Sequence, residues 1–425
     1  MSSPPIRSWL PLILLLAVSL TDLQAQGRHH ENYDDADPWA GFEPADRGPD
    51  SAAVARLLTA LAAADPVVCQ LAASSVGNNW HRWDGSYQSG LLRNEDSEQV
   101  ARDAFGQQVT DPRALAQLSD ALGNPKPCVR RTAARMLGNG KEPQALNLLR
   151  AAVVDADPQT REAAALGLAE AEDPASFHLL ARALEDREPA VARMAAYALG
   201  ELEDARAVKP LGGLLRSKDP ETRATAAHAL GAIEDIRAVE GLTFLVGDAD
   251  PRVRIAAVEA LGEIEDYRAT SALSEALRDK QVAVRRAAAQ ALGSVESHQG
   301  AGPLAKAIDD SDPVVRRLAV QALGELDNLK HTPPRLVAAL RDQDPVLVAL
   351  AAQSLGQIGD TTAVPGLAAA YASPDPRIRY AVIRALAEMD DRRVKATLTL
   401  ARNDRDRVVR HTAAEALKDL EDDDE

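Results

Sequence analysis

Aspartate and arginine recur as pairs along the chain, four residues apart, and ion pairing is the chemistry that such pairs can supply. The pairs are Asp157 and Arg161, Asp219 and Arg223, Asp250 and Arg254, Asp312 and Arg316, and Asp375 and Arg379. If equivalent elements stack on one another, the arginine of one element lies beside an aspartate of the next. We therefore expect a structural ladder of ion pairs and not a catalytic centre.

A second series of arginines could contact a partner. Its members are Arg206, Arg237 and Arg268, with Arg393 further along. Each precedes a predicted helix of the kind that usually lines the concave side of a helical array, where guanidinium groups could donate to the carboxylates of a bound peptide. The alternative is a local and weak exposed ion pair, such as Arg237 with Glu234 or Asp235.

The usual catalytic and metal-binding sets are missing from the sequence. It contains no Gly-rich phosphate loop, no nucleophile elbow and no Cys-His zinc spacing. His29 and His30 precede three aspartates and could bind a divalent cation weakly, but their polar surroundings favour a solvated linker. Five further histidines occupy different positions of the internal repeat described below, so they are not expected to converge on one site. They are expected at surfaces or turns: His178, His228, His298, His331 and His411. We expect no catalytic residue, metal or cofactor.

An internal repeat of about 31 residues explains the regular spacing. Its motif is Asp-Pro-x-x-Arg-x-x-Ala-Ala-x-Ala-Leu-Gly, and the final glycine recurs as Gly138, Gly200, Gly231, Gly262, Gly293, Gly324 and Gly356. Aspartate caps a helix N-terminus, and proline loses no hydrogen bond at the first helical position. The glycine is expected to end the helix in a left-handed conformation. We call this helix A; a turn and a second apolar helix, helix B, such as 238–246, complete the unit.

Alternating A and B helices predict an all-α fold. Stacked units would form an α-solenoid of about ten antiparallel helix pairs, a right-handed superhelix over residues 51–420. Aromatic residues make up only 3% of the chain, and small residues such as Ala226 and Ala227 would let helices approach closely. Two sites depart from the repeat motif. Gln281-Val282 replaces Asp-Pro and is expected to loosen the start of a helix, and the segment near Thr332-Pro333-Pro334 is expected to hold a one-residue insertion.

The repeat resembles the HEAT-repeat superfamily, specifically short HEAT-like repeats of the phycobilisome-lyase type. The resemblance rests on motifs such as Asp219-Pro220-Glu221-Thr222-Arg223 followed by Ala226-Ala227-His228-Ala229-Leu230-Gly231, and it covers residues 51–420. It implies a fold but no particular function. One HEAT-like family of di-iron hydroxylases needs repeated His-Glu pairs. His30-Glu31 is the only such dipeptide here, so the resemblance implies that this activity lacks its ligands.

The N-terminus predicts export from the cell. Arg7 precedes an apolar run over 9–20, and a polar stretch ends at Ala25. This is the order of a secretory signal peptide, residues 1–25; the apolar run is short for an uncleaved anchor, the alternative interpretation. Residues 26–50 are expected to be an acidic disordered linker, and residues 421–425 an acidic tail. The net charge of −16 lies mostly in these segments, so no basic stripe offers itself to nucleic acid or membranes.

The two cysteines, Cys69 and Cys128, are expected in the first turns of neighbouring A helices. An oxidising compartment favours a disulfide, which needs Cα atoms about 4.4–6.8 Å apart. The two residues occupy different positions in the repeat, however, and two unbonded buried cysteines are the alternative.

An insertion over residues 78–110 interrupts the first unit and contains Trp80, Trp83 and Tyr87. An insertion in a solenoid forms a loop on one face, which makes an aromatic recognition loop one interpretation. The other is a cap that covers the end of the array, because terminal repeats need one.

Together these features favour a non-enzymatic scaffold of the cell envelope, secreted or periplasmic, that binds a protein or peptide on the concave solenoid surface. Nucleic acid is not expected as a partner, nor is an integral membrane segment after signal cleavage. The alternative function is an enzyme or enzyme subunit of the HEAT-like lyase type, or a degenerate hydroxylase.

Replacing both Trp80 and Trp83 with alanine separates the two interpretations of the insertion. A cap predicts a clear loss of thermal stability, because each buried aromatic side chain contributes on the order of 3–5 kcal/mol. A recognition loop predicts a stable protein that no longer captures its partner. Unchanged melting together with unchanged capture would contradict both.

Overall fold

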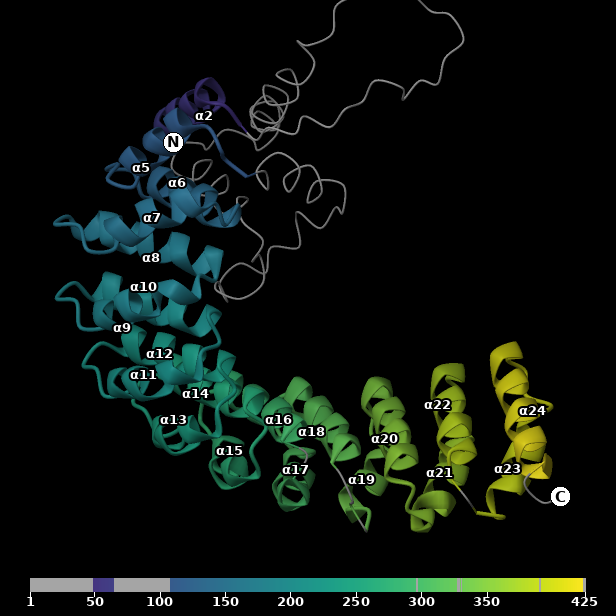
Figure 1. Cartoon of the computed structure of the whole chain (residues 1–425). Helices are drawn as coiled ribbons and strands as arrows, with labels where there is room; N and C mark the ends of the chain where they lie inside the picture. The colour runs from purple at the N-terminus through teal and green to yellow at the C-terminus, as the bar shows by residue number, and fades with distance from the viewer. Residues whose placement is uncertain are drawn as a thin grey trace, which may run out of the picture. The chain divides into compact units, whose positions relative to one another are not determined.

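The computed structural model describes residues 49–64 and 108–422, other than 296, 327, 328, 330 and 390. In these residues the regular secondary structure is entirely helical (Figure 1). They form two compact units, the first ending at Leu202 and the second beginning at Glu203. Ten A helices and ten B helices alternate in the described part of the chain, which confirms the predicted all-α solenoid.

The first unit holds three A helices and three B helices. The A helices are α6 (Pro127–Asn139), α8 (Pro158–Ala171) and α10 (Pro189–Glu201), and each packs on the next. The B helices are α5 (Pro112–Ala121), α7 (Pro143–Ala152) and α9 (Phe177–Ala183), which follows the 3-10 helix η2 (Pro174–Ser176). Helix α2 (Ser51–Ala63) packs against α5.

The second compact unit, residues 203–425, contains seven A helices and seven B helices in the same alternating order among its described residues. Its A helices are α12 (Pro220–Ala232), α14 (Pro251–Glu263), α16 (Val282–Ser294), α18 (Pro313–Glu325), α20 (Pro345–Ile358), α22 (Pro376–Ala387) and α24 (Arg407–Asp422). Its B helices are α11 (Val208–Leu214), α13 (Val239–Leu245), α15 (Thr270–Ala276), α17 (Ala301–Ala307), α19 (Pro334–Ala339), α21 (Val364–Ala370) and α23 (Val394–Ala401). A 3-10 turn precedes five of them: η3 (Ala205–Ala207), η4 (Ile236–Ala238), η5 (Tyr267–Ala269), η6 (His298–Gly300) and η7 (Thr361–Ala363).

Within the second unit the A helices lie side by side in one layer and the B helices in another (Figure 1). Each A helix packs along the next A helix, whereas each B helix packs mainly on the A helix that follows it. Leucines one position before the repeat glycine fill the space between units. Leu199, Leu230, Leu261, Leu292 and Leu323 are fully buried, as the repeat predicts.

Aspartate caps the A helices as predicted. The Asp250 carboxylate accepts from the backbone N–H of Arg252, and Asp157, Asp219, Asp312, Asp344 and Asp375 make equivalent bonds. Gln281 makes no side-chain capping bond, yet α16 still begins at the next residue, Val282. The departure at Gln281 therefore removes a cap without shortening the helix.

The prediction that the repeat glycine ends helix A is wrong. Gly262 is buried inside α14, and a Cβ atom there would lie 2.8 Å from Ala291 Cβ and 3.0 Å from Ala291 Cα of α16. Gly356 meets Ala385 of α22 in the same way, with its Cβ 2.8 Å from the Ala385 Cα. The glycine is present because neighbouring A helices approach too closely for any side chain.

The left-handed residue that the turn needs lies three positions later. Its described members are Lys141, Glu172, Glu203, Glu234, Glu265 and Gly359, with φ between 47° and 68°. The repeat glycine thus allows the close helix contact, and a different residue, three positions later, takes the left-handed conformation of the turn. That residue is usually charged, although glycine tolerates the conformation better.

The one-residue insertion near Thr332-Pro333-Pro334 changes one B helix. Helix α19 starts directly at Pro334 and spans six residues. The Thr332 backbone N–H donates to the Asp360 carboxylate at 2.8 Å, which anchors the inserted segment to the following unit.

Gly262→Ala should destabilise the second unit, by about 1–3 kcal/mol, because α14 and α16 would have to move apart. Gly213→Ala is the matched control, since no atom lies within 4 Å of a Cβ built on Gly213 in α11. Alanine should stabilise that helix by about 0.5–1 kcal/mol. Urea unfolding followed by circular dichroism measures both, and equal stability of the two variants would contradict the packing role.

Candidate protein-binding surface

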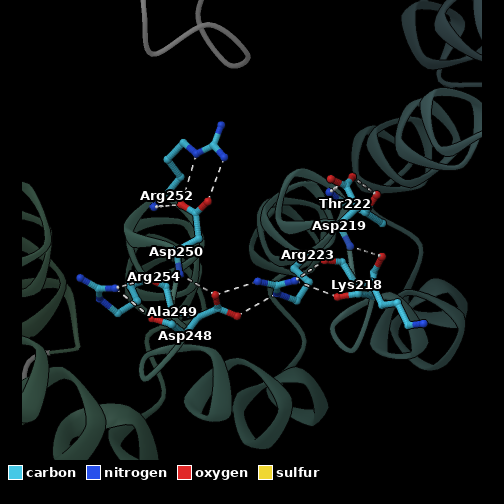
Figure 2. Close-up of polar contacts among 10 residues, drawn as sticks. Lys218, Asp219, Thr222, Arg223, Asp248, Ala249, Asp250, Arg252 and Arg254 are labelled. Atoms are coloured by element: carbon cyan, nitrogen blue, oxygen red, sulfur yellow. Dashed lines mark hydrogen bonds and ion pairs between the residues drawn. The ribbon is translucent and has the colours of Figure 1, made fainter.

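The predicted ion-pair ladder joins successive repeats at several places, one of which is shown in Figure 2. Arg223 donates from Nε and Nη2 to both carboxylate oxygens of Asp248, each at 2.8 Å, and from Nη1 to the Ser217 carbonyl. The Arg223 guanidinium therefore forms hydrogen bonds both within its own repeat and to the next repeat. Equivalent pairs are Arg161–Asp186, Arg254–Asp279, Arg285–Asp310 and Arg379–Asp404.

The acceptor in each pair differs from the helix-capping aspartate of the sequence motif. Asp248 lies two residues before the capping Asp250, in the turn that leads into α14, and Asp248 also accepts from the Asp250 backbone N–H at 2.9 Å. The capping Asp250 instead pairs with the exposed Arg252, which lowers the Asp250 pKa to about 2. Separate aspartates thus cap the helix and bind the ladder arginine.

The ladder is interrupted at Arg316. The Arg316 Nε is buried without a hydrogen-bond partner, and Nη1 donates only to the carbonyl of Asp310, in its own unit's turn, at 3.3 Å. The residue 25 positions later is Arg341, because the one-residue insertion displaces the expected aspartate to position 342. A shift of one residue is therefore enough to break the contact between units.

The most buried ladder pair is Arg379 with Asp404, whose side chains are 5% and 4% exposed. Asp404 also accepts from the Tyr371 hydroxyl at 2.6 Å. The Arg379 guanidinium holds the Asp404 pKa well below its usual range. Burial, together with the Asp404 charge, raises the pKa of Tyr371 to about 12.

The arginines of the second series lie at the 3-10 turns, and each pairs with an aspartate of its own turn. Arg237 donates to both carboxylate oxygens of Asp235, and its Nη2 also donates to the Ala205 carbonyl of the preceding unit at 2.8 Å. Arg268 repeats this with Asp266 and the Ile236 carbonyl, and Arg206 pairs with Asp204. These contacts favour the local-pairing interpretation, and the acceptor is the turn aspartate, not Glu234.

Several predicted site residues lie outside the described residues. Trp80, Trp83, Tyr87 and Cys69 are among them, as are the signal peptide, residues 26–48 of the acidic linker and His29-His30. Cys128 is described and is 7% exposed in the first turn of α6. The aromatic loop or cap and the disulfide with Cys69 stay predictions. The end of the insertion is described at Gln108, whose amide donates to Glu142 at 2.6 Å.

One surface that the sequence analysis missed is the exposed face of the A helices in the second unit. Residues at the second, ninth and thirteenth positions of an A helix lie on one line along the helix, because seven residues span nearly two turns. The ninth position is exposed in every A helix of this unit: His228, Glu259, Gln290, Gln321, Gln353, Arg384 and Glu415. We call this set the A-face row. The sequence repeat showed that one residue per repeat occupies this position, but only the structure showed that this residue is exposed while its neighbours in the helix are mostly buried.

Other features that could carry chemistry are small or missing in the part of the chain that the structure describes. A pocket lined by Pro127, Arg130, Arg131 and Met194 is about the size of a water molecule. The described histidine, cysteine, aspartate and glutamate side chains form no group of three that could hold a metal ion. Among the described helices, none is long and apolar enough to cross a membrane.

Comparison with protein families settles the family. The model for HEAT repeats matches residues 91–169, 113–188, 176–246, 242–324 and 333–418, which is well over half of the chain. The chain belongs to the HEAT repeat family. This confirms the resemblance to HEAT repeats that the sequence motifs indicated, and no curated protein matches the chain.

Several solved structures match the chain, and one of them, importin β, resembles it in fold. Importin β is 14% identical with a TM-score of 0.55, over 86% of this chain and 57% of its own. The complex of CpcE and CpcF of phycocyanin lyase from Nostoc sp. is 22% identical with a TM-score of 0.34, over 53% of this chain and 92% of that chain. Human deoxyhypusine hydroxylase is 25% identical with a TM-score of 0.28, over 58% and 96%.

Asp404→Asn should destabilise the end of the second unit by about 3–5 kcal/mol, because it leaves Arg379 buried and unpaired. The folded-state pKa of Asp404 is depressed, so its stabilisation is complete above the unfolded pKa of about 4 and is lost as the pH falls towards the folded value. The stability difference between wild type and Asp404→Asn should therefore shrink below about pH 4. Urea unfolding at several pH values measures it.

Asp309→Asn is the control for a charge that is not buried. Asp309 pairs with Arg335, and the two side chains are 64% and 51% exposed. Its loss should change stability by less than about 1 kcal/mol at any pH. An effect as large as that of Asp404→Asn would contradict the link between burial of the ladder and its strength.

Proposed function

We propose that the chain is a non-enzymatic scaffold of the cell envelope that binds a protein or peptide along the exposed face of its A helices. The observation that carries this proposal is the A-face row, an exposed side chain repeated once per unit over seven consecutive A helices. A partner that lies across the helices would meet a new contact at each unit, so many weak contacts add to a specific interface.

The pairing of the arginines with aspartates favours a binding surface over a catalytic centre. The ladder arginines other than Arg316 are bound by turn aspartates, and Arg206, Arg237 and Arg268 are bound by Asp204, Asp235 and Asp266. A catalytic group needs a proton or charge available to a substrate, and these groups are held in closed pairs. What the array presents to a partner is a long surface.

The sequence analysis expected the B helices to line the concave surface, whereas this proposal places the concave surface on the A face. Small residues and the repeat glycine bring the A helices into close contact, so their layer is the more closely spaced one. An array bends towards its more closely spaced layer. The envelope location rests on the signal-peptide pattern of residues 1–25.

Site-specific photo-crosslinking in cells that export the chain tests the proposal. A photoreactive side chain at Glu259, Gln321 or Glu415 of the A-face row should crosslink to a partner protein. The same group at Lys209, Ser271 or Lys306, which are exposed on the B helices, should not. Purified protein should carry neither a bound chromophore nor stoichiometric iron.

Crosslinks confined to the B-helix positions would contradict the proposed surface. A covalently attached chromophore or stoichiometric iron would contradict the non-enzymatic function and favour the lyase-type or hydroxylase alternative. Retention of the mature chain in the cytoplasm would contradict the envelope location.

A further inference from the structure

Three consecutive A helices of the second unit carry an uncharged tract on their exposed face. In the A-face row, α16, α18 and α20 present Gln290, Gln321 and Gln353, between the charged Glu259 of α14 and Arg384 of α22. The three glutamines are exposed, and Gln321 donates to Glu325 at 2.9 Å. Exposed positions elsewhere in the row differ from unit to unit, so three identical primary amides in succession form a distinct surface.

A second row changes from charged to uncharged in the same three helices. The second position of the A helix is Arg252 in α14 and Arg377 in α22, but it is Ala283, Val314 and Val346 in α16, α18 and α20. Val346 is 44% exposed. Two separate positions of the repeat therefore become uncharged between the same two neighbours.

The space between the two rows is also neutral. Arg286 of α16 donates from Nε and Nη2 to Asp312 at 2.9 and 2.7 Å, and Arg317 of α18 donates to Asp344 at 2.8 Å. Each charge is thus compensated by the capping aspartate of the next unit, while the aliphatic stem of the arginine stays at the surface. Ala349 takes the equivalent place in α20. The seven residues between the rows correspond to about 10 Å along each helix.

The spacing of the rows selects one backbone conformation. Closely packed helices lie about 8–10 Å apart, so the glutamines and the small apolar residues repeat at that distance across the array. A polyproline II helix has three residues per turn and rises about 9.3 Å per turn, so it offers the same face every three residues. A β-strand reverses its face over three residues. An α-helix shows the same face at a comparable distance only after about seven residues, and its backbone carbonyls are already bonded within the helix, so they are not available to glutamine amides.

We infer that this tract binds an uncharged peptide segment in the polyproline II conformation, about seven to nine residues long, laid across α16, α18 and α20. This inference rests on the proposed function. The backbone of such a segment has no internal hydrogen bonds, so one carbonyl per turn accepts from a glutamine amide. Its proline or alanine side chains lie on the Ala283, Val314 and Val346 row, where they remove apolar surface from water.

Fluorescence anisotropy with a labelled nonapeptide of three Pro-Pro-Ala repeats tests the inference on the full mature chain. Saturable binding is expected, with little change between about 0.05 and 0.3 M salt because no charge pair is involved. A Gly-Ser peptide of equal length should bind more weakly, since it must lose more backbone entropy. Replacing Gln290, Gln321 and Gln353 with alanine should weaken binding about tenfold or more.

The matched control replaces His228, Glu259 and Glu415 with alanine, three exposed residues of the same row outside the tract. Binding of the Pro-Pro-Ala peptide should then stay within about twofold of wild type. Absence of saturable binding, equal binding of the Gly-Ser peptide, or equal losses in both triple variants would overturn the inference. Crosslinking of a native partner at Glu259 and Glu415 but not at Gln321 would also overturn it while leaving the proposed function intact.

Discussion

Close contact between successive A helices is the constraint on which the rest of the structure depends. The repeat glycine permits it, since a Cβ at Gly262 would lie 2.8 Å from the Cβ of Ala291. Protein interiors hold no space for such an overlap, so a side chain at this position would force the helices apart. The spacing of the A helices in turn sets the distance between equivalent surface residues, and that distance decides which partner conformation fits the A face.

The arginine ladder fixes the register that the helix contact leaves open. Apolar packing between smooth, alanine-rich faces is non-directional, whereas a guanidinium bound to two carboxylate oxygens has a defined geometry. Arg223 and Asp248 hold one unit against the next in this way, with a third bond to the Ser217 carbonyl. Where the insertion displaces the acceptor, Arg316 keeps its place and loses its pair. The ladder therefore depends on constant repeat length as well as on residue type, since Ala192 and Val348 take the place of the arginine in α10 and α20.

The sequence was sufficient to predict the helices and their order, because Asp-Pro at the start of each A helix and apolar spacing after it are local signals. It was insufficient for the glycine. The same residue fits a left-handed helix end and a close helix contact, and only the neighbouring helix distinguishes the two. It identified four of the ladder arginines but missed Arg285, which Gln281 precedes in place of aspartate, and it included Arg316, which is unpaired. It did not identify the acceptors, because Asp248 and Asp250 are both turn aspartates and stacking selects between them. The A-face row was hidden because its residue types vary from unit to unit.

The central claim is that a partner covers the A face, and oxidative footprinting tests it directly because both faces carry exposed oxidisable side chains. On the A face these are Val346 and Val408, 44% and 58% exposed; on the B helices they are Phe244 and Leu400, 77% and 63% exposed. Hydroxyl-radical labelling of the chain in its native envelope fraction should be compared with labelling of the purified chain. The account predicts protection of Val346 and Val408 with unchanged labelling of Phe244 and Leu400. Protection of Phe244 and Leu400 with full labelling of Val346 and Val408 would contradict it.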